Sequence, residues 1–297
     1  MSAAVDMRTV DRAPVPALVA QRFSLEATRP TADEVARLKD TVPSGTLVYV
    51  TAVPSQTAAE QVQAAARLRR AGLEPVAHIA ARRLASLGAM RDLLKGLRDE
   101  ADMRQLLVIG GDVETSGPLP DALAVIRQGN LRALGFEEIG VGGYPEGHPR
   151  IAPGRLEAAL DEKIAIAVAQ GLRVHIVSQF SFSPDRILAW LKQLRGCGMA
   201  WPVRIGVVGP TSVPALLRFA RRCGVNASLR GLVSGAATSL VGHVGPGRII
   251  EALSAADDLG DIALHYFSFG GTVETARYAC EAAAGRHGAH RAMAHPN

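Results

Sequence analysis

QLLVIGG (residues 105–111) is a short apolar run that ends in two glycines, and Asp112 follows it directly. Similar runs recur along the whole chain, each rich in aliphatic and β-branched residues. A longer amphipathic segment separates each run from the next, which indicates strands that alternate with helices. We therefore predict eight strands, at residues 22–28, 46–52, 74–80, 105–111, 138–144, 173–179, 203–209 and 262–269.

The segments between these runs carry helix signals. TADEVARLKDTV (31–42) begins with Thr31, and Glu34 three residues later completes a capping box. TAAEQVQAAARLRRAG (57–72) ends at Gly72, a residue typical of the position after a helix. Apolar strands that alternate with helices form parallel sheets, and eight such units predict an α/β fold, the (β/α)8 TIM barrel. A doubly wound open sheet is the alternative, although no GxGxxG motif follows the first strand.

The same units predict how the chain is divided. We expect an N-terminal tail at 1–20, a single TIM-barrel catalytic domain at 21–283 and a flexible C-terminal tail at 284–297. The connection between the seventh and eighth strands is long and is predicted to hold extra helices. GHVGPGR (242–248) opens the last of them, and such a glycine-rich loop either holds an anion or simply starts the helix.

The composition argues against several classes of protein. The chain has 297 residues and a net charge of +5, but no basic block with interleaved aromatics, so nucleic-acid binding is not expected. No apolar run reaches the roughly 18 residues that would span a membrane. The three cysteines lie far apart and the histidines lack short ligand spacing, so no metal site is predicted. This cysteine usage is typical of a reduced, cytoplasmic protein.

Polar side chains end most of the predicted strands. In a TIM barrel the chemistry lies at the carboxyl ends of the strands, so these side chains should converge on one rim. One such residue is explained by a cap or a turn, but six or more on one rim favour a site. They are Glu26, Thr51, His78, Asp112, Tyr144, Glu146, His148 and Gln179.

Two carboxylates are the candidates for acid chemistry. Glu26 lies in FSLEAT between apolar neighbours, and partial burial there would raise its pKa, as a general acid requires. The alternative is a structural pair with an arginine such as Arg29. Asp112 follows Gly110 and Gly111, and it either accepts hydrogen bonds from ring N–H groups or caps the next helix.

The candidates for ligand binding are an amide, an aromatic ring and an imidazole. Gln179 has a donor and an acceptor side by side, which suits the edge of a pterin or pyrimidine. Phe180 next to it either stacks on such a ring or belongs to the core. His78 either contacts a ligand or is a satisfied core histidine, whereas His175 lies in the middle of its strand and is expected to be structural.

Several of these segments together resemble motifs of the methylenetetrahydrofolate reductase family. The family motifs read roughly YPExHP, TQxxFD and RGDxP, and FEFFPPR, VSVTxG and HLT. The matching segments, in that order, are YPEGHP (144–149), SQFSFS (178–183), GGDV (110–113), SLEATRP (24–30), VYVTA (48–52) and HIA (78–80). The resemblance covers residues 22 to about 283, and each motif lies on the corresponding strand. YPEGHP is its most specific part.

The resemblance implies a function. The family reduces 5,10-methylenetetrahydrofolate to 5-methyltetrahydrofolate with NADH or NADPH, and the reverse direction is equally open. By this resemblance Glu26 protonates folate N10, Asp112 lies near the flavin and pterin, and Gln179 contacts the folate, with Phe180 beside it. A homo-oligomer is a further implication of the family. The expected cofactor-binding residues are Thr51, His78, Gly111, Tyr144 and His148.

FAD is the family's usual cofactor, and two departures argue against it here. The family arginine before Gly-Asp, a flavin contact, is Gly110 in this chain. The helix after YPEGHP should carry a basic residue in its C-terminal half, but residues 164–171 are uncharged. We therefore expect a divergent reductase that passes hydride directly from NAD(P)H to the folate. The alternatives are a folate- or nucleotide-binding barrel without reductase activity and another pterin-dependent one-carbon enzyme.

Overall fold

Eight parallel strands close into a barrel at the centre of the computed structural model, which describes residues 18–54, 56–113, 117–212 and 243–286. Their spatial order is β1-β10-β7-β6-β5-β4-β3-β2, and β1 pairs with both β10 and β2. The TIM barrel is therefore confirmed and the open sheet is wrong. All eight predicted strands are present: β1 (Phe23–Ala27), β2 (Leu47–Val50), β3 (Glu74–Ala80), β4 (Gln105–Ile109), β5 (Glu138–Gly143), β6 (Arg173–Ser178), β7 (Val203–Val208) and β10 (Ile262–Phe267).

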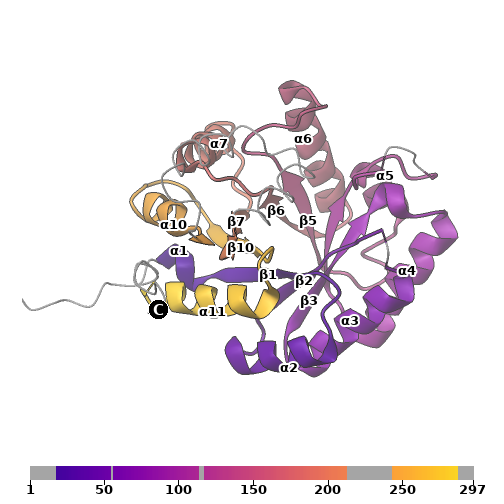
Figure 1. The fold of residues 1–297 in the computed structure, drawn as a ribbon. Helices are drawn as coiled ribbons and strands as arrows, with labels where there is room; N and C mark the ends of the chain where they lie inside the picture. Colours follow the sequence, from indigo (N-terminus) through magenta and orange to yellow (C-terminus); the bar gives the residue numbers. More distant parts are fainter. Residues whose placement is uncertain (1–17, 55, 114–116, 213–242, 287–297) are drawn as a thin grey trace, which may run out of the picture.

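A ring of helices surrounds the barrel (Figure 1). They are α2 (Ala32–Thr41), α3 (Ala58–Arg70), α4 (Leu87–Ala101), α5 (Ala122–Gln128), α6 (Pro153–Ala169), α7 (Pro184–Gly196), α10 (Gly247–Ser254) and α11 (Thr272–Ala283). A short helix, α1 (Leu18–Gln21), precedes β1 and contacts α11 and β10. Because Val19 and Ala20 are buried there, packed structure begins inside the stretch 1–20 that the sequence analysis assigns to a tail.

The two predicted helix signals are confirmed. Thr31 Oγ1 accepts a hydrogen bond from the Glu34 N–H at 3.2 Å, and the Glu34 carboxylate accepts one from the Thr31 N–H at 3.0 Å. Thr57 forms the same capping box at the start of α3. Gly72 follows α3 with φ of +81°, a conformation that costs glycine little. Local sequence therefore determines the ends of these two helices.

The connection between β7 and β10 contains α10 and a small antiparallel ribbon, made of β8 (Thr211–Ser212) and β9 (His243–Val244). As expected, α10 begins in the GHVGPGR segment, with Pro246 at its N-cap position. One helix of the predicted extra helices is thus present. The rest of that prediction falls on residues 213–242, outside the described residues.

The interior of the barrel is unusually polar. A small apolar cluster of Tyr49, Val76, Leu107 and Val177 lies inside, apart from the large cluster between strands and helices. Branched aliphatic side chains usually fill a TIM barrel. Here the barrel strands also contribute buried polar side chains to the interior, namely Ser24, Glu26, His78, His175 and His265. Buried polar groups need partners, so their hydrogen bonds decide which of them are structural.

His175 belongs to a structural chain of hydrogen bonds. Tyr49 Oη lies 2.9 Å from His175 Nε2, and His175 Nδ1 lies 2.7 Å from Glu138 Oε1. The hydrogen bond from His175 lowers the pKa of Glu138, because it stabilises the charged carboxylate. Both ring nitrogens of His175 therefore have partners, in keeping with the structural role expected from its mid-strand position.

Gly206 of β7 packs closely against the backbone at the end of β6. A Cβ at this position would lie 2.4 Å from Ser178 O and 2.8 Å from Phe180 N, and both of these are backbone atoms. Gly206→Ala must therefore push β6 and Gln179 away. We expect the free energy of unfolding to fall by about 1–3 kcal/mol in urea denaturation.

The matched control for this variant is Gly154→Ala in the first turn of α6. An added Cβ there meets nothing within 4 Å. Alanine is favoured over glycine in a helix by about 0.5–1 kcal/mol, so the control should be neutral or slightly more stable than the parent. Equal stability of the two variants would contradict the steric argument.

Candidate active site

A buried carboxylate lies at the carboxyl end of β1. Glu26 is 8% exposed, and burial raises its pKa to about 7 because the charged form loses hydration. The Nε2 atoms of His78 (β3) and His265 (β10) each lie 3.4 Å from Glu26 Oε1. Arg29, the alternative partner for Glu26, instead pairs with Glu60 at 3.5 Å. The structure thus brings Glu26 and His78 together and adds His265, which the sequence analysis did not select.

The hydrogen bonds around His265 determine which ring nitrogen carries the proton. Ser24 Oγ donates to Leu264 O at 3.3 Å, so it accepts from His265 Nδ1, 2.9 Å away. Burial and the positive charge of Arg204 lower the pKa of His265 to about 3, so the ring is neutral. Its Nε2 lone pair then faces Glu26. This contact favours the protonated form of Glu26, which alone has a proton to donate.

His78 places a second neutral imidazole beside the acid. The side chain is 7% exposed, and burial lowers its pKa. Its Nε2 atom is shielded from solvent and makes no hydrogen bond with the described residues. It lies 3.4 Å from Glu26 Oε1, so the acid is its polar neighbour even though the geometry is not that of a hydrogen bond. The predicted ligand-binding role of His78 therefore stays a prediction.

Further predicted cofactor-binding residues lie on the same rim. Thr51 follows β2, and its Oγ1 donates to Thr28 Oγ1 at 3.0 Å. Tyr144 and His148 follow β5, with their rings edge to face and 5.6 Å between centroids. The Arg150 N–H donates to His148 Nδ1 at 3.2 Å, so the proton of this ring is on Nε2. Tyr144 and His148 thus offer an aromatic wall and an N–H donor.

Asp112 lies on the rim in an ion pair. Its side chain is 69% exposed, and Oδ1 accepts a hydrogen bond from Arg83. Arg83 belongs to η1 (Ala81–Arg83), the 3-10 turn after β3. The capping alternative for Asp112 is wrong, because Asp121 caps α5. The structure gives no contact between Asp112 and Glu26, so the predicted catalytic role of Asp112 stays a prediction.

Gln179 and Phe180 follow β6 but differ in exposure. The Gln179 side chain is partly exposed, and its oxygen accepts from the Phe180 N–H at 3.3 Å. Phe180 is fully buried, with ring neighbours Phe182, Phe267 and Phe269 at centroid distances of 5.7, 5.1 and 5.2 Å. A ring without an exposed face cannot stack on a ligand. We therefore correct the prediction for Phe180, which is a core residue here.

The helix after YPEGHP carries a cation that the sequence argument overlooked. Residues 164–171 are uncharged, but Lys163 directly precedes them in α6. Burial lowers the pKa of Lys163, and the charge of Asp121 at the start of α5 opposes that shift. The C-terminal half of α6 is therefore not without a basic residue, which weakens one of the two arguments against FAD.

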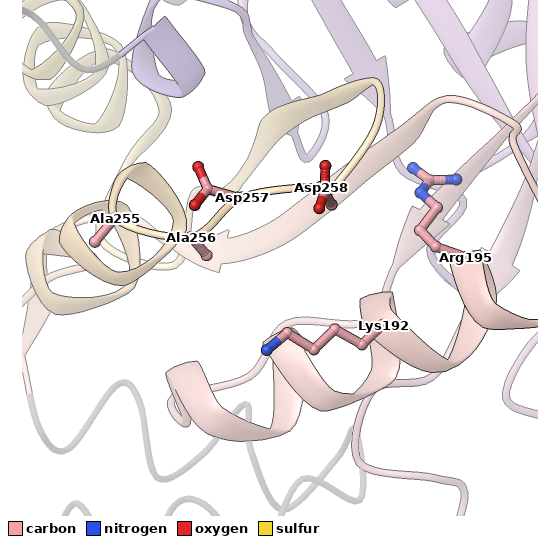
Figure 2. Close-up of a pocket in the computed structure, with 6 residues that line it drawn as sticks. All are labelled: Lys192, Arg195, Ala255, Ala256, Asp257 and Asp258. Carbon is pink, nitrogen blue, oxygen red and sulfur yellow. The ribbon is translucent and has the colours of Figure 1, made fainter.

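A shallow depression of about 610 Å³ lies between α7 and the segment that joins α10 to β10 (Figure 2). It is lined by Lys192, Arg195, Ala255, Ala256, Asp257 and Asp258. Arg195 donates to the carbonyl oxygens of Met199, Trp201 and Leu259, in the segments that lead into β7 and β10. Arg195 therefore holds the loops that precede β7 and β10. None of the residues that line the depression belongs to the rim site.

Two further findings concern the described part of the chain alone. No group of three or more His, Cys, Asp or Glu side chains there is placed to hold a metal ion. No helix within the same ranges has both the length and the apolar character needed to cross a bilayer. Of the three cysteines, Cys197 and Cys280 are unbridged, and Cys223 lies outside the described ranges.

The fold and the rim together define a class: a TIM-barrel protein with a buried acid between two neutral imidazoles, beside a wall suited to flat ligands. The model of the methylenetetrahydrofolate reductase family matches residues 24–229, well over half of the chain. The chain therefore belongs to the methylenetetrahydrofolate reductase family.

Several solved structures have a chain trace similar to that of this protein. A Thermus thermophilus dihydropteroate synthase in complex with 6HMPPP is 14% identical, with 91% of this chain and 93% of that chain covered and a TM-score of 0.49. A Yersinia pestis DHPS with a pterine-sulfa conjugate is 12% identical, with 92% and 96% covered and a TM-score of 0.47. The Aquifex aeolicus 3-dehydroquinate dehydratase is 9% identical, with 89% and 97% covered and a TM-score of 0.46. We draw no functional conclusion from similarities at this level.

Proposed function

We propose that this protein reduces 5,10-methylenetetrahydrofolate to 5-methyltetrahydrofolate with NADH or NADPH, and that Glu26 is its general acid. Membership of the family supports the substrate and the reaction type. The observation that carries the role of Glu26 is its burial between two neutral imidazoles, with a pKa of about 7. An acid with a pKa near the working pH is both protonated often enough and acidic enough to be effective.

The proposed chemistry has two steps. Glu26 gives its proton to folate N10, the bond between N10 and the bridging carbon breaks, and the electron pair stays on N10. The bridging carbon is then part of an iminium ion at N5. Hydride from the reduced nicotinamide adds to that carbon, which yields the methyl group and the oxidised nicotinamide. Glu26 regains its proton from solvent before the next turnover.

The other rim residues would bind and orient the reactants. Gln179 presents its amide to the pterin edge, and Asp112 accepts from ring N–H groups when the folate competes with Arg83. The flat ring of the hydride donor is proposed to lie among Thr51, His78, Gly111, Tyr144 and His148. Gly111 has φ of +90°, a backbone conformation that glycine adopts at little cost.

These residues fit a flavin as well as a nicotinamide, because an aromatic wall and a buried imidazole suit either ring. When bound, FAD would supply a hydride relay between the nicotinamide and the folate. We propose direct transfer; its support is the departure from the family sequence at Gly110, although Arg82 places another guanidinium over that position. A flavin spectrum of the purified protein distinguishes the two routes, since stoichiometric flavin would contradict direct transfer.

The test of the function is an anaerobic assay with the purified protein. NADH and NADPH are each supplied with 5,10-methylenetetrahydrofolate, and the folate product is identified by chromatography. We expect oxidation of a nicotinamide that depends on the folate and yields 5-methyltetrahydrofolate. Folate binding without nicotinamide oxidation would overturn the proposal in favour of a binding protein or another one-carbon enzyme.

A further inference from the structure

A guanidinium group lies on the rim where the sequence analysis placed none. Arg82 is the middle residue of η1, directly after β3, and its N–H donates to Gly110 O at 3.0 Å. Its Nη2 donates to the carbonyl oxygen of Gly111. These two hydrogen bonds fix both the backbone and the side chain of Arg82 against the end of β4.

Gly110 provides the space for this guanidinium. A Cβ on Gly110 would lie 3.4 Å from Arg82 Nη1, 3.7 Å from Cζ and 3.8 Å from Nη2. The guanidinium plane therefore covers the position from which any side chain of residue 110 would project. A large side chain at position 110 and Arg82 in this orientation exclude each other. A cation at this point of the rim can thus come from β3 or from β4.

Much of the hydrogen-bonding capacity of Arg82 is unused. Nε is shielded from solvent and has no hydrogen-bond partner among the described residues. Within the same ranges no carboxylate lies within ion-pair distance of Arg82, whereas neighbouring Arg83 pairs with Asp112. A partly buried cation without a counter-charge is costly, and a guanidinium with spare donors is well suited to phosphate oxygens.

The group also lies beside the strand that leads to the proposed cofactor wall. The positive charge of Arg82 acts to lower the pKa of both Tyr144 and His148, although burial is the larger influence on each. Arg82 is held against Gly110 and Gly111 at the end of β4, and β4 pairs with β5, the strand that Tyr144 and His148 follow. A ligand lying on Tyr144 and His148 would therefore have a cation beside it.

We propose that Arg82 is a cofactor-binding residue whose guanidinium binds the pyrophosphate of a dinucleotide lying on the Tyr144–His148 wall. This inference rests on the proposed function for the identity of the cofactor class, since NADH, NADPH and FAD all join a flat redox ring to a pyrophosphate. Gly110 is part of the same binding site, because it leaves the space that the guanidinium occupies. The tandem arginines 82 and 83 then have separate roles, one for the ligand and one for Asp112.

The test measures equilibrium binding of NADH, NADPH and FAD separately, by calorimetry with the full-length protein. For whichever dinucleotide binds the parent, Arg82→Gln should raise the dissociation constant by roughly 10- to 100-fold, the change expected for loss of a charged hydrogen bond. Arg127→Gln, which removes an exposed arginine paired with Glu162 on the outer helices, is the matched control and should bind normally. Thermal unfolding of each variant confirms that it is folded.

A double variant separates binding from a structural role of Arg82. The double variant Arg82→Ala, Gly110→Arg supplies a guanidinium from residue 110, directly after β4, instead of from residue 82. It should recover most of the affinity that Arg82→Ala alone loses. Absence of this rescue, or normal affinity of Arg82→Gln, would overturn the proposal, and so would a parent protein that binds none of the three dinucleotides. Dinucleotide binding that depends on Arg82 in a protein without reductase activity would refute only the proposed function.

Discussion

Replacing Glu26 by glutamine is expected to reduce turnover by about 100- to 10,000-fold, the usual contribution of a general acid. The variant keeps the size of the side chain and can still donate an N–H to His265 Nε2, so the pocket should keep its shape. It has no proton to give to folate N10. Binding of the folate and of the nicotinamide should persist, and the measurement is stopped-flow nicotinamide oxidation alongside equilibrium binding.

The control is Glu138→Gln, at the other end of the barrel interior. Glu138 is also a partly buried carboxylate next to a histidine, but it bonds His175 and lies far along the strands from the rim. It should lower stability while leaving the turnover of the folded protein near normal. Glu26→Gln with turnover intact would remove Glu26 from the mechanism. In the parent, kcat/KM should fall as the pH rises through about 7, since only protonated Glu26 is active.

The fold and the position of the acid follow from local sequence. Each strand is an apolar run, and each run ends near a turn residue, so the eight strands could be predicted to within about two residues at each end. Glu26 and His78 could be selected because each interrupts an apolar strand near its carboxyl end. A parallel barrel brings those ends to one rim, so selecting them required no knowledge of individual contacts.

The missed residues depend on contacts that no local pattern contains. His265 lies within IALHYFSF and resembles a core histidine, and only the closing pair of strands, β1 with β10, brings it to Glu26 across 239 positions. Arg82 resembles a solvated charge after a strand, and its packing over Gly110 joins residues from two different βα units. Conversely, Phe180 has the right neighbours for a stacking residue, but its burial depends on aromatic rings contributed by β10 and the loop that follows it.

The second large effect concerns stability rather than turnover. The pKa of Glu26 is about 7 in the folded protein, whereas the ordinary pKa of an unburied glutamate is 4.5. Between these two values the folded state holds more protons than the unfolded state, so the free energy of unfolding falls as the pH rises. The loss is complete above pH 7. Its size is on the order of 3 kcal/mol, at about 1.4 kcal/mol for each unit of pKa.

Glu26→Gln removes this proton uptake, so urea unfolding at two pH values isolates it. At pH 8 the variant should be more stable than the parent by on the order of 3 kcal/mol, and near pH 4.5 the two should agree. The lowered pKa values of His78, His175 and His265 act in the opposite direction, because they make the folded state lose stability as the pH falls. All three histidines are present in both proteins, so they largely cancel in the difference, apart from the pKa-raising influence of Glu26 on His78. A difference that does not change between pH 4.5 and pH 8 would mean that Glu26 is charged in the folded protein, and the acid would then have to be sought elsewhere on the rim.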